Sequence, residues 1–307
     1  MKKNIKIGLA LGSGAARGWA HIGVIKRLQE LGVKPDVVCG TSVGALVGAA
    51  YVAGNIDKLD TWVRALGKLE TARYFTINRS FKGFVNKERF SQFLKEFVVD
   101  NKLNIEDIDR PFATVATELH SGREIWNTSG SMMDAVWASI SLPGLFPAIK
   151  HNDRWLIDGG LVNPVPVSVC RALGADVVIA VNLNSDIVSK HFLAEAEDLS
   201  VKEPSFTGRI SNMITDYTNS LFGRGNDSDE EEVPDLLDAI AASINITQDR
   251  ITRSRMAGDP PDIMLTPRLS MIGLLEFYRG AEAINEGTKS VDRHKADFES
   301  LLGGRLN

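Results

Sequence analysis

Residues 37–48 read Val-Val-Cys-Gly-Thr-Ser-Val-Gly-Ala-Leu-Val-Gly, and the prediction of the fold starts from this stretch. The apolar run at 37–39 is typical of a buried strand, and the small residues after Gly44 are typical of a closely packed helix. Between them, Gly40-Thr41-Ser42-Val43-Gly44 matches the G-x-S-x-G pattern, whose small flanking residues permit a sharp turn from strand to helix. We therefore predict a strand, a tight turn that exposes the Ser42 hydroxyl, and a helix over 45–53.

A similar strand and helix precede this turn. Residues 5–11 are mostly apolar, and residues 17–31 carry apolar side chains at helical spacing, with Gly32 in place to end the helix. Two such units in succession imply a right-handed crossover and a parallel sheet. The alternation continues, with predicted strands at 112–117, 124–127, 155–158 and 177–182 and predicted helices at 87–99, 131–140 and 165–173. The expected fold class is therefore α/β, with a mainly parallel central sheet.

Beyond residue 203 the chain changes character. Helical patterns at 207–221, 236–256 and 274–302 surround an acidic stretch near 226–233 and the helix-breaking sequence Gly258-Asp259-Pro260-Pro261. We expect an α/β domain over 1–203 and a mostly helical C-terminal portion over 204–307. The four adjacent acids from Asp229 to Glu232 are typical of a solvated loop, with contact to a basic partner as the alternative.

The composition is that of a globular protein and excludes several classes. The chain has 307 residues, of which 44% are hydrophobic and 24% are charged. Its 35 basic residues against 39 acidic ones leave no positive excess to bind a phosphate backbone, so we expect no nucleic acid partner. Two cysteines in a chain of this size indicate a reducing compartment, and Lys6 interrupts the apolar run that a secretion signal needs. A cytoplasmic location is therefore expected.

Ser42 is the candidate nucleophile. In the predicted turn its hydroxyl lies at the N-terminus of a helix, where the helix dipole favours a developing negative charge. The alternative is a purely structural role, in which Ser42 is the N-cap of that helix.

A glycine-rich turn, Gly12-Ser13-Gly14-Ala15-Ala16-Arg17-Gly18, follows the first strand and begins the first helix. Backbone amides in such a turn converge on an anion. A dinucleotide fingerprint requires glycine or alanine where this chain has Arg17, and the Gly-Lys-Ser/Thr ending of a P-loop is missing from the turn. We expect instead an oxyanion hole, with nucleotide binding as the alternative. Its donors are the amides of Gly12, Ser13, Gly14 and Ala15.

A serine nucleophile needs a proton acceptor, and Asp158 is the candidate base. It ends the apolar run at 155–157 and precedes Gly159-Gly160, which permits close approach to another backbone. An aspartate base requires partial burial to raise its pKa from about 3.9. The alternative for Asp158 is a turn-forming Asp-Gly sequence.

The five histidines offer no comparable candidate, because none ends a predicted strand. His21 lies on the flank of the first predicted helix, where a packed side chain is the simpler interpretation. An α/β-hydrolase that uses histidine would follow the chain order serine, aspartate, histidine, and would take His191 or His294 as its third member.

The glycine-rich turn, the G-x-S-x-G turn and the Asp-Gly-Gly turn, in this order, resemble the patatin-like phospholipase family, and within it the bacterial proteins similar to neuropathy target esterase. The family's motifs match Gly14 to Gly18, Gly40 to Gly44 and Asp158 to Gly160, and the likeness extends over roughly residues 5–184. Where many members have three successive glycines, this chain has Ser13-Gly14-Ala15. We do not expect Ala15 to adopt a conformation restricted to glycine.

The resemblance implies a three-layer α/β/α patatin-like fold and a serine-aspartate dyad that works without histidine. It implies that Ser42 attacks a carboxylic ester of a phospholipid or lysophospholipid and that Asp158 takes its proton, through an acyl-enzyme and with no metal or cofactor. A lipid substrate also implies peripheral contact with the inner face of a membrane. The motif residues expected to support the site are Arg17, Gly18, Gly40, Gly44, Gly159 and Gly160. The alternative is a catalytically weak regulatory or scaffold protein of the same fold.

Overall fold

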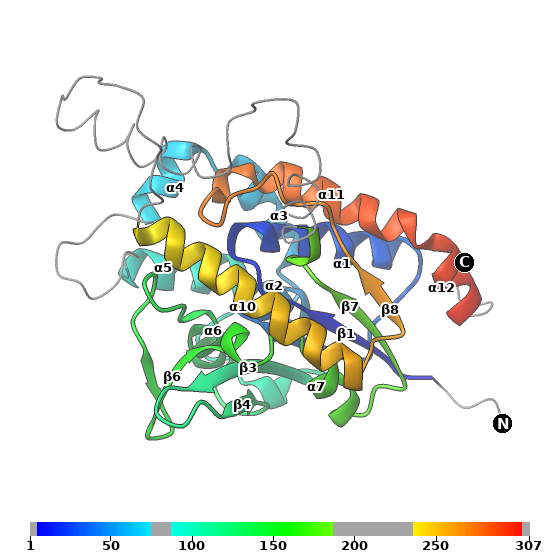
Figure 1. Ribbon diagram of the computed structural model, residues 1–307, viewed down its shortest axis with the longest axis horizontal. Helices are drawn as coiled ribbons and strands as arrows, with labels where there is room; N and C mark the ends of the chain where they lie inside the picture. The colour runs from blue at the N-terminus through cyan, green and yellow to red at the C-terminus, as the bar shows by residue number, and fades with distance from the viewer. Residues whose placement is uncertain (1–4, 75–86, 187–235, 303–307) are drawn as a thin grey trace, which may run out of the picture.

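The computed structural model describes residues 5–74, 87–186 and 236–302, which fold around an eight-stranded sheet (Figure 1). The strand order is β5-β6-β3-β2-β1-β7-β8, with β4 beside β3. The parallel strands are β1 (Ile7–Leu11), β2 (Val37–Thr41), β3 (Phe112–Glu118), β7 (Val177–Val181) and β8 (Ile263–Leu265). The antiparallel strands are β4 (Glu124–Asn127), β5 (Ile149–His151) and β6 (Arg154–Asp158).

Helices cover both faces of the sheet. The helices on one face are α1 (Ala20–Glu30), α2 (Val43–Val52), α6 (Met132–Ile140) and α11 (Gly280–Arg293). The helices on the other are α7 (Val167–Ala172) and α10 (Leu236–Gly258), and α10 crosses the sheet in the view of Figure 1. In β1, Leu9 and Leu11 enter the core on the first face and Ala10 enters the core on the second. A strand buried on both faces needs a continuous apolar run. The predicted three-layer α/β/α fold with a mainly parallel sheet is confirmed.

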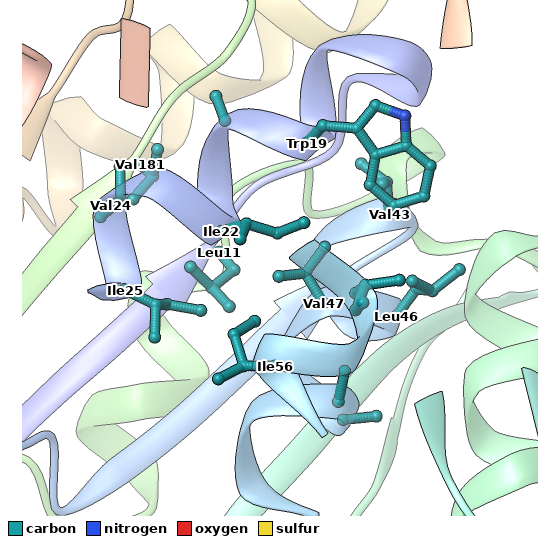
Figure 2. Close-up of a cluster of buried hydrophobic side chains, with 14 of the residues drawn as sticks. Leu11, Trp19, Ile22, Val24, Ile25, Val43, Leu46, Val47, Ile56 and Val181 are labelled. Atoms are coloured by element: carbon teal, nitrogen blue, oxygen red, sulfur yellow. The ribbon is translucent and has the colours of Figure 1, made fainter. Parts of the chain in front are cut away.

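The core on the first face anchors the strand-turn-helix unit around Ser42. Figure 2 shows Leu11 of β1 close to Ile22 and Ile25 of α1 and to Val47 of α2, with Val43 nearby at the start of α2. Burial of each such side chain contributes about 1.5–3 kcal/mol to the free energy of folding. The start of α2 is therefore held firmly against β1 and α1.

Several predicted helices have different bounds. The helix expected over 17–31 begins as a 3-10 helix, η1 (Ala15–Trp19), in which the amide of Arg17 donates to the carbonyl of Gly14, three residues earlier. The helix expected over 87–99 is α5 (Lys87–Phe93) followed by one π-helical turn over 94–98. The helix expected over 274–302 is divided into η5 (Phe277–Arg279), α11 and α12 (Lys295–Leu302). The break between α11 and α12 lies at His294, where the backbone leaves helical geometry with a φ of −107°.

Other elements have no predicted counterpart. These are α3 (Ile56–Ala65), α4 (Lys68–Tyr74), β5 and β8. The expected helix at 207–221 and the acidic loop near 226–233 lie outside the described residues. The division of the chain at residue 203 stays a prediction, but β8, from the portion expected to be mostly helical, pairs with β7 in the central sheet.

The C-terminal helix α11 packs on α1 through a close contact between backbones. A Cβ atom on Gly23 would lie 1.9 Å from the carbonyl oxygen of Ile284, and one on Gly287 would lie 2.0 Å from that of Ala20. Two glycines on facing helices therefore permit the close approach.

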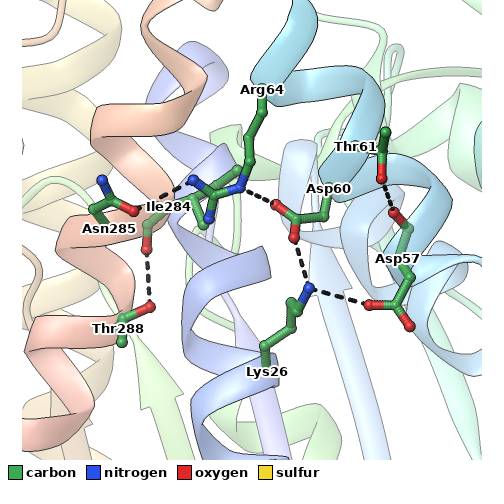
Figure 3. Close-up of polar contacts among 8 residues, drawn as sticks. All are labelled: Lys26, Asp57, Asp60, Thr61, Arg64, Ile284, Asn285 and Thr288. Carbon is green, nitrogen blue, oxygen red and sulfur yellow. Dashed lines mark hydrogen bonds and ion pairs between the residues drawn. The ribbon is translucent and has the colours of Figure 1, made fainter.

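Polar contacts join the same region. Figure 3 shows Asp60 of α3 accepting from Lys26 of α1 at 2.6 Å and from Arg64 at 2.7 Å, while Arg64 also reaches Asn285 of α11 at 3.4 Å. These bonds connect α1, α3 and α11 on the face of the sheet that carries α2.

We expect Gly287→Ala to destabilise the protein. The added Cβ has no space against the Ala20 carbonyl, so α11 must move away from α1, at a cost of about 1–3 kcal/mol in the free energy of unfolding. Urea unfolding measures the difference. The control is Gly258→Ala at the end of α10, where no heavy atom lies within 4 Å of the added Cβ and no loss is expected. Equal stability of Gly287→Ala and wild type would contradict the close packing.

Candidate active site

The strands β2 and β6 pair with the same side of β3, and their C-terminal ends meet there. Thr41, the last residue of β2, pairs with Val115, and Asp158, the last residue of β6, pairs with Ala116. On the opposite side, both Val115 and Ala116 pair with β4. Because β2 runs parallel to β3 and β6 runs antiparallel to it, the two carboxyl ends meet. This register brings Ser42, which follows β2, next to Asp158.

Ser42 lies in a strained turn between β2 and α2. Its φ of 56° and ψ of −126° are unfavourable for a residue with a side chain, at a cost of about 1–3 kcal/mol. Ser42 occupies the N-cap position of α2, but its side chain makes no capping bond. Its hydroxyl instead donates to Oδ2 of Asp158 at 2.5 Å. The interpretation of Ser42 as a capping side chain is therefore wrong.

The turn requires the glycines at positions 40 and 44, because a side chain at either position would collide with the backbone. A Cβ on Gly40 would lie 2.4 Å from the carbonyl oxygen of Gly44, and one on Gly44 would lie 2.1 Å from that of Leu11. The G-x-S-x-G spacing thus lets α2 start directly against the ends of β1 and β2. The Ser42 amide donates to the hydroxyl of Ser139 at 2.9 Å, which fixes the turn from α6.

Asp158 is fully buried, and both of its carboxylate oxygens are bonded. Oδ2 accepts from Ser42, and Oδ1 accepts from the Gly160 amide at 2.7 Å. Burial raises the pKa of Asp158 to about 6, while the bonds from Ser42 and Gly160 act in the opposite direction. Asp158 thus forms the Asp-Gly turn considered from the sequence and at the same time presents an oxygen to Ser42. A Cβ on Gly159 would lie 2.2 Å from the Val115 carbonyl oxygen, so the turn needs glycine there.

The amides of the glycine-rich turn divide into two pairs. The Gly12 amide donates to the Val181 carbonyl at 3.1 Å, and the Ser13 amide donates to the Pro164 carbonyl at 2.8 Å. Gly12 and Ser13 are therefore not available as oxyanion donors, which corrects the expectation from the sequence. Within the described part of the chain, the amides of Gly14 and Ala15 make no hydrogen bond.

Val43 offers a further amide that the sequence analysis missed. It is the first residue of α2, and the first amides of a helix have no partner within the helix. The signal was present in the sequence, because the residue after the serine of a G-x-S-x-G turn supplies an oxyanion amide in α/β-hydrolases. The candidate oxyanion donors are then Gly14, Ala15 and Val43.

Ala15 has a φ of 47°, in the left-handed region. A positive φ is uncommon for a residue with a side chain, but it is not restricted to glycine. The left-handed conformation costs an alanine about 1–2 kcal/mol, which the surrounding structure tolerates.

Two further motif residues, Gly18 and Arg17, hold the glycine-rich turn against α2 and α10. A Cβ on Gly18 would lie 2.2 Å from the side chain of Val43, so this glycine lets η1 pack on α2. Arg17 is buried, and its guanidinium donates to Oδ1 of Asn245 in α10 at 2.9 Å. Burial lowers the pKa of Arg17 to about 10. Arg17 thus ties the turn to α10.

No histidine in the described residues bonds to the Ser42–Asp158 pair. His21 Nε2 bonds the Gly12 carbonyl at 2.7 Å, and burial lowers the pKa of His21 to about 4. His294 Nδ1 bonds the Ser290 carbonyl at 2.9 Å. His191 lies outside the described residues. A histidine-containing triad therefore has no support from His21 or His294.

A mostly apolar pocket opens beside Ser42. Its lining includes Ser42 and two of the three residues that carry candidate oxyanion amides, Ala15 and Val43. Aromatic and aliphatic side chains form the rest, with Trp19 packed edge-on against Trp62 and Phe277 at ring separations of 6.4 and 6.0 Å. An apolar lining of this kind favours an apolar group over a charged one.

Two further features concern metals and membranes. Across residues 5–74, 87–186 and 236–302, no group of three or more His, Cys, Asp or Glu side chains is arranged to hold a metal ion. None of the helices that the structure describes combines the length and the apolar character needed to cross a bilayer.

Comparison with known proteins gives the family. An "Uncharacterized NTE family protein" of Mycobacterium tuberculosis is 28% identical over 342 residues, which cover 96% of this chain and 92% of that protein. Lysophospholipase NTE1 of Pyricularia oryzae is 29% identical over 289 residues, covering 92% of this chain but 18% of that protein. Lysophospholipase nte1 of Aspergillus fumigatus is 29% identical over 286 residues with the same coverage, 92% and 18%. The chain thus spans less than a fifth of these fungal relatives.

The sequence profile described as patatin-like phospholipase matches residues 9–171. The matched region contains the glycine-rich turn, the turn at Ser42 and the turn at Asp158. Because the match spans more than half of the chain, this protein belongs to the patatin-like phospholipase family.

Proposed function

We propose that this chain hydrolyses a carboxylic ester of a phospholipid or lysophospholipid with Ser42 as nucleophile and Asp158 as general base. Membership of the family makes it a carboxylic ester hydrolase that acts on lipids. The observation that carries the assignment of residues is the 2.5 Å bond from the Ser42 hydroxyl to a fully buried carboxylate. A base within hydrogen-bond reach of the nucleophile is the arrangement that this chemistry requires.

The reaction proceeds in two halves. Asp158 accepts the proton of Ser42 while Oγ attacks the ester carbonyl, and the amides of Gly14, Ala15 and Val43 stabilise the negative charge on the carbonyl oxygen. The tetrahedral intermediate expels the alcohol, which takes the proton from Asp158, and an acyl-enzyme remains. Water then loses a proton to Asp158, attacks the acyl carbon and releases the fatty acid as Ser42 regains its proton.

The apolar pocket supports an acyl chain as the group next to Ser42. Its lining offers little that would bind a charged head group, so we place the acyl chain in the pocket and the head group outside it. The fungal relatives named lysophospholipases support a substrate with one acyl chain. Peripheral contact with a membrane and a cytoplasmic location stay predictions.

We expect Ser42→Ala to lower ester hydrolysis at least about 1000-fold, because the nucleophile is lost. Release of fatty acid from lysophosphatidylcholine and of p-nitrophenol from a short ester measures the rate, and circular dichroism checks the fold. The double variant His191→Ala/His294→Ala is the control and keeps the wild-type rate. If it loses as much activity as Ser42→Ala, a histidine is the base. If wild type neither hydrolyses these esters nor reacts with a fluorophosphonate probe, the regulatory or scaffold alternative holds.

We expect kcat/KM to fall on the acidic side of about pH 6. The base works only as a carboxylate, and burial raises the pKa of Asp158 to about 6. Below that value the ionised fraction, and with it kcat/KM, falls about tenfold per pH unit. Fatty acid release between about pH 4.5 and 8 measures the profile. A rate that stays constant down to about pH 4.5 would exclude a base with this pKa.

We expect Asp158→Asn to be inactive yet more stable than wild type at about pH 8. The pKa of Asp158 is higher in the folded chain than the value of about 3.9 in the unfolded chain, so wild type loses stability as pH rises between the two values. Asparagine carries no charge and avoids this loss, and the difference disappears near pH 4. Urea midpoints at both pH values test the sign. The control is Asp153→Asn, whose side chain is 97% exposed and pairs with Lys150 at the surface, so that its replacement shifts neither midpoint appreciably.

A further inference from the structure

Helix α10 buries polar side chains against the active-site turns. Asn245, Gln248, Asp249 and Thr252 are each less than 8% exposed, although residues of these types usually face solvent. Asp249 bonds Arg253 within the helix at 2.7 Å, and Asn245 receives the bond from Arg17. The remaining residue, Gln248, contacts both the glycine-rich turn and the turn at Asp158.

The side chain of Gln248 contacts the glycine-rich turn through its oxygen. Oε1 accepts from the Ser13 hydroxyl at 2.9 Å and from the Asn184 amide group at 2.9 Å. Ser13 directly precedes Gly14 and Ala15, whose amides are the proposed oxyanion donors. The Ser13 amide is held by Pro164, so Gln248 adds a second restraint to the same residue.

The other end of the same side chain packs on the aspartate turn. A Cβ on Gly160 would lie 2.4 Å from Nε2 of Gln248, so only a glycine lets this amide group come so close. The Gly160 amide is the group that bonds Oδ1 of Asp158. One buried side chain of α10 therefore touches the residue that precedes the oxyanion amides and the residue that holds the carboxylate.

We propose that Gln248 is a positioning residue that keeps the oxyanion turn and the Asp158 turn in register for catalysis. This inference rests on the proposed function of Ser42 and Asp158. Catalysis requires donors and base to be held within about 0.5 Å of their working positions. A side chain in contact with both turns supplies that restraint from a helix that lies far away in the sequence.

The charged groups around this junction do not bond the Asp158 carboxylate. Arg17 bonds Asn245, His21 bonds the Gly12 carbonyl, and Asp249 bonds Arg253. In the described residues, the hydrogen bonds of the Asp158 carboxylate come from Ser42 and Gly160. A change in the titration of Asp158 after substitution of Gln248 therefore reports on the Gly160 contact.

The test is Gln248→Met in the full chain, since methionine keeps the length of the side chain and removes both polar ends. We expect kcat to fall about 10- to 100-fold with KM changed less than about twofold, because positioning acts on the transition state. We also expect the acidic limb of kcat/KM to move to higher pH, because the Gly160 amide that favours the carboxylate is less well held. Hydrolysis of a p-nitrophenyl ester and of lysophosphatidylcholine measures both.

The matched control is Ile246→Ala on the same helix, because Ile246 is 56% exposed. It keeps the wild-type kcat and pH profile. Ser13→Ala removes only the bond between Gln248 and the glycine-rich turn, so it lowers kcat without moving the acidic limb of the kcat/KM profile. Its effect is not additive with that of Gln248→Met, because both remove the same bond. If Gln248→Met does not fold, Gln248→Asn, which keeps an amide at shorter reach, takes its place.

The proposal is overturned if the acidic limb stays in place, or if activity falls only in proportion to the folded fraction measured by thermal unfolding. Measurements on the wild type distinguish a failure of the role proposed for Gln248 from a failure of the proposed function. A wild type that hydrolyses the ester and labels with a fluorophosphonate at Ser42, beside a Gln248→Met variant that behaves identically, removes only the role of Gln248. A wild type without activity or label removes the proposed function itself.

Discussion

The meeting of β2 and β6 end to end along one side of β3 is the constraint on which the site depends. A parallel strand and an antiparallel strand share one edge of β3, and each ends where the other ends. Neither strand can continue without colliding with the other, so both chains must turn away at this point. The residues at the two turns are Ser42 and Asp158, and their side chains face each other across the gap at 2.5 Å.

This arrangement stores unfavourable free energy at the site, and the core around it keeps the site in place. Ser42 has a φ of 56°, and Asp158 is a carboxyl group with no exposure to solvent. Each costs on the order of 1–3 kcal/mol. The apolar contacts of α2 with β1 and α1, and the docking of α11 on α1, hold the backbone against relaxation. Strain and burial at one place are typical of a site whose chemistry needs a reactive hydroxyl and a basic carboxylate.

The C-terminal portion takes part in this architecture. β8 extends the sheet beside β7, α11 packs on α1 through Gly23 and Gly287, and α10 lies over the active-site turns. Arg17 and Gln248 connect residues near the start of the chain with residues near its end. The proposed catalytic residues all precede residue 159, yet some of the contacts that hold the glycine-rich turn and the Asp158 turn come from α10, beyond residue 236.

The sequence by itself predicted the features that arise from local sterics. The small residues Gly40 and Gly44 on either side of Ser42 predict a sharp turn from strand to helix, and the apolar runs of β1, β2 and β7 predict strands buried on both faces. The position of Asp158 at the end of a predicted strand suggested its pairing with Ser42, and the family resemblance supported that pairing. Elements of three residues, such as β5 and β8, carry too little pattern to be predicted.

Tertiary structure alone decided which groups are free to act. Gly12 and Ser13 look equivalent to Gly14 and Ala15 in the sequence, but Val181 and Pro164 accept the first two amides and leave the second two without a partner among the described residues. The pKa of Asp158 and the contacts of Gln248 likewise depend on burial and on strand pairing between distant segments. Local sterics act through neighbours in the chain and are legible there, whereas hydrogen-bond partners and desolvation are set by segments that meet only after folding.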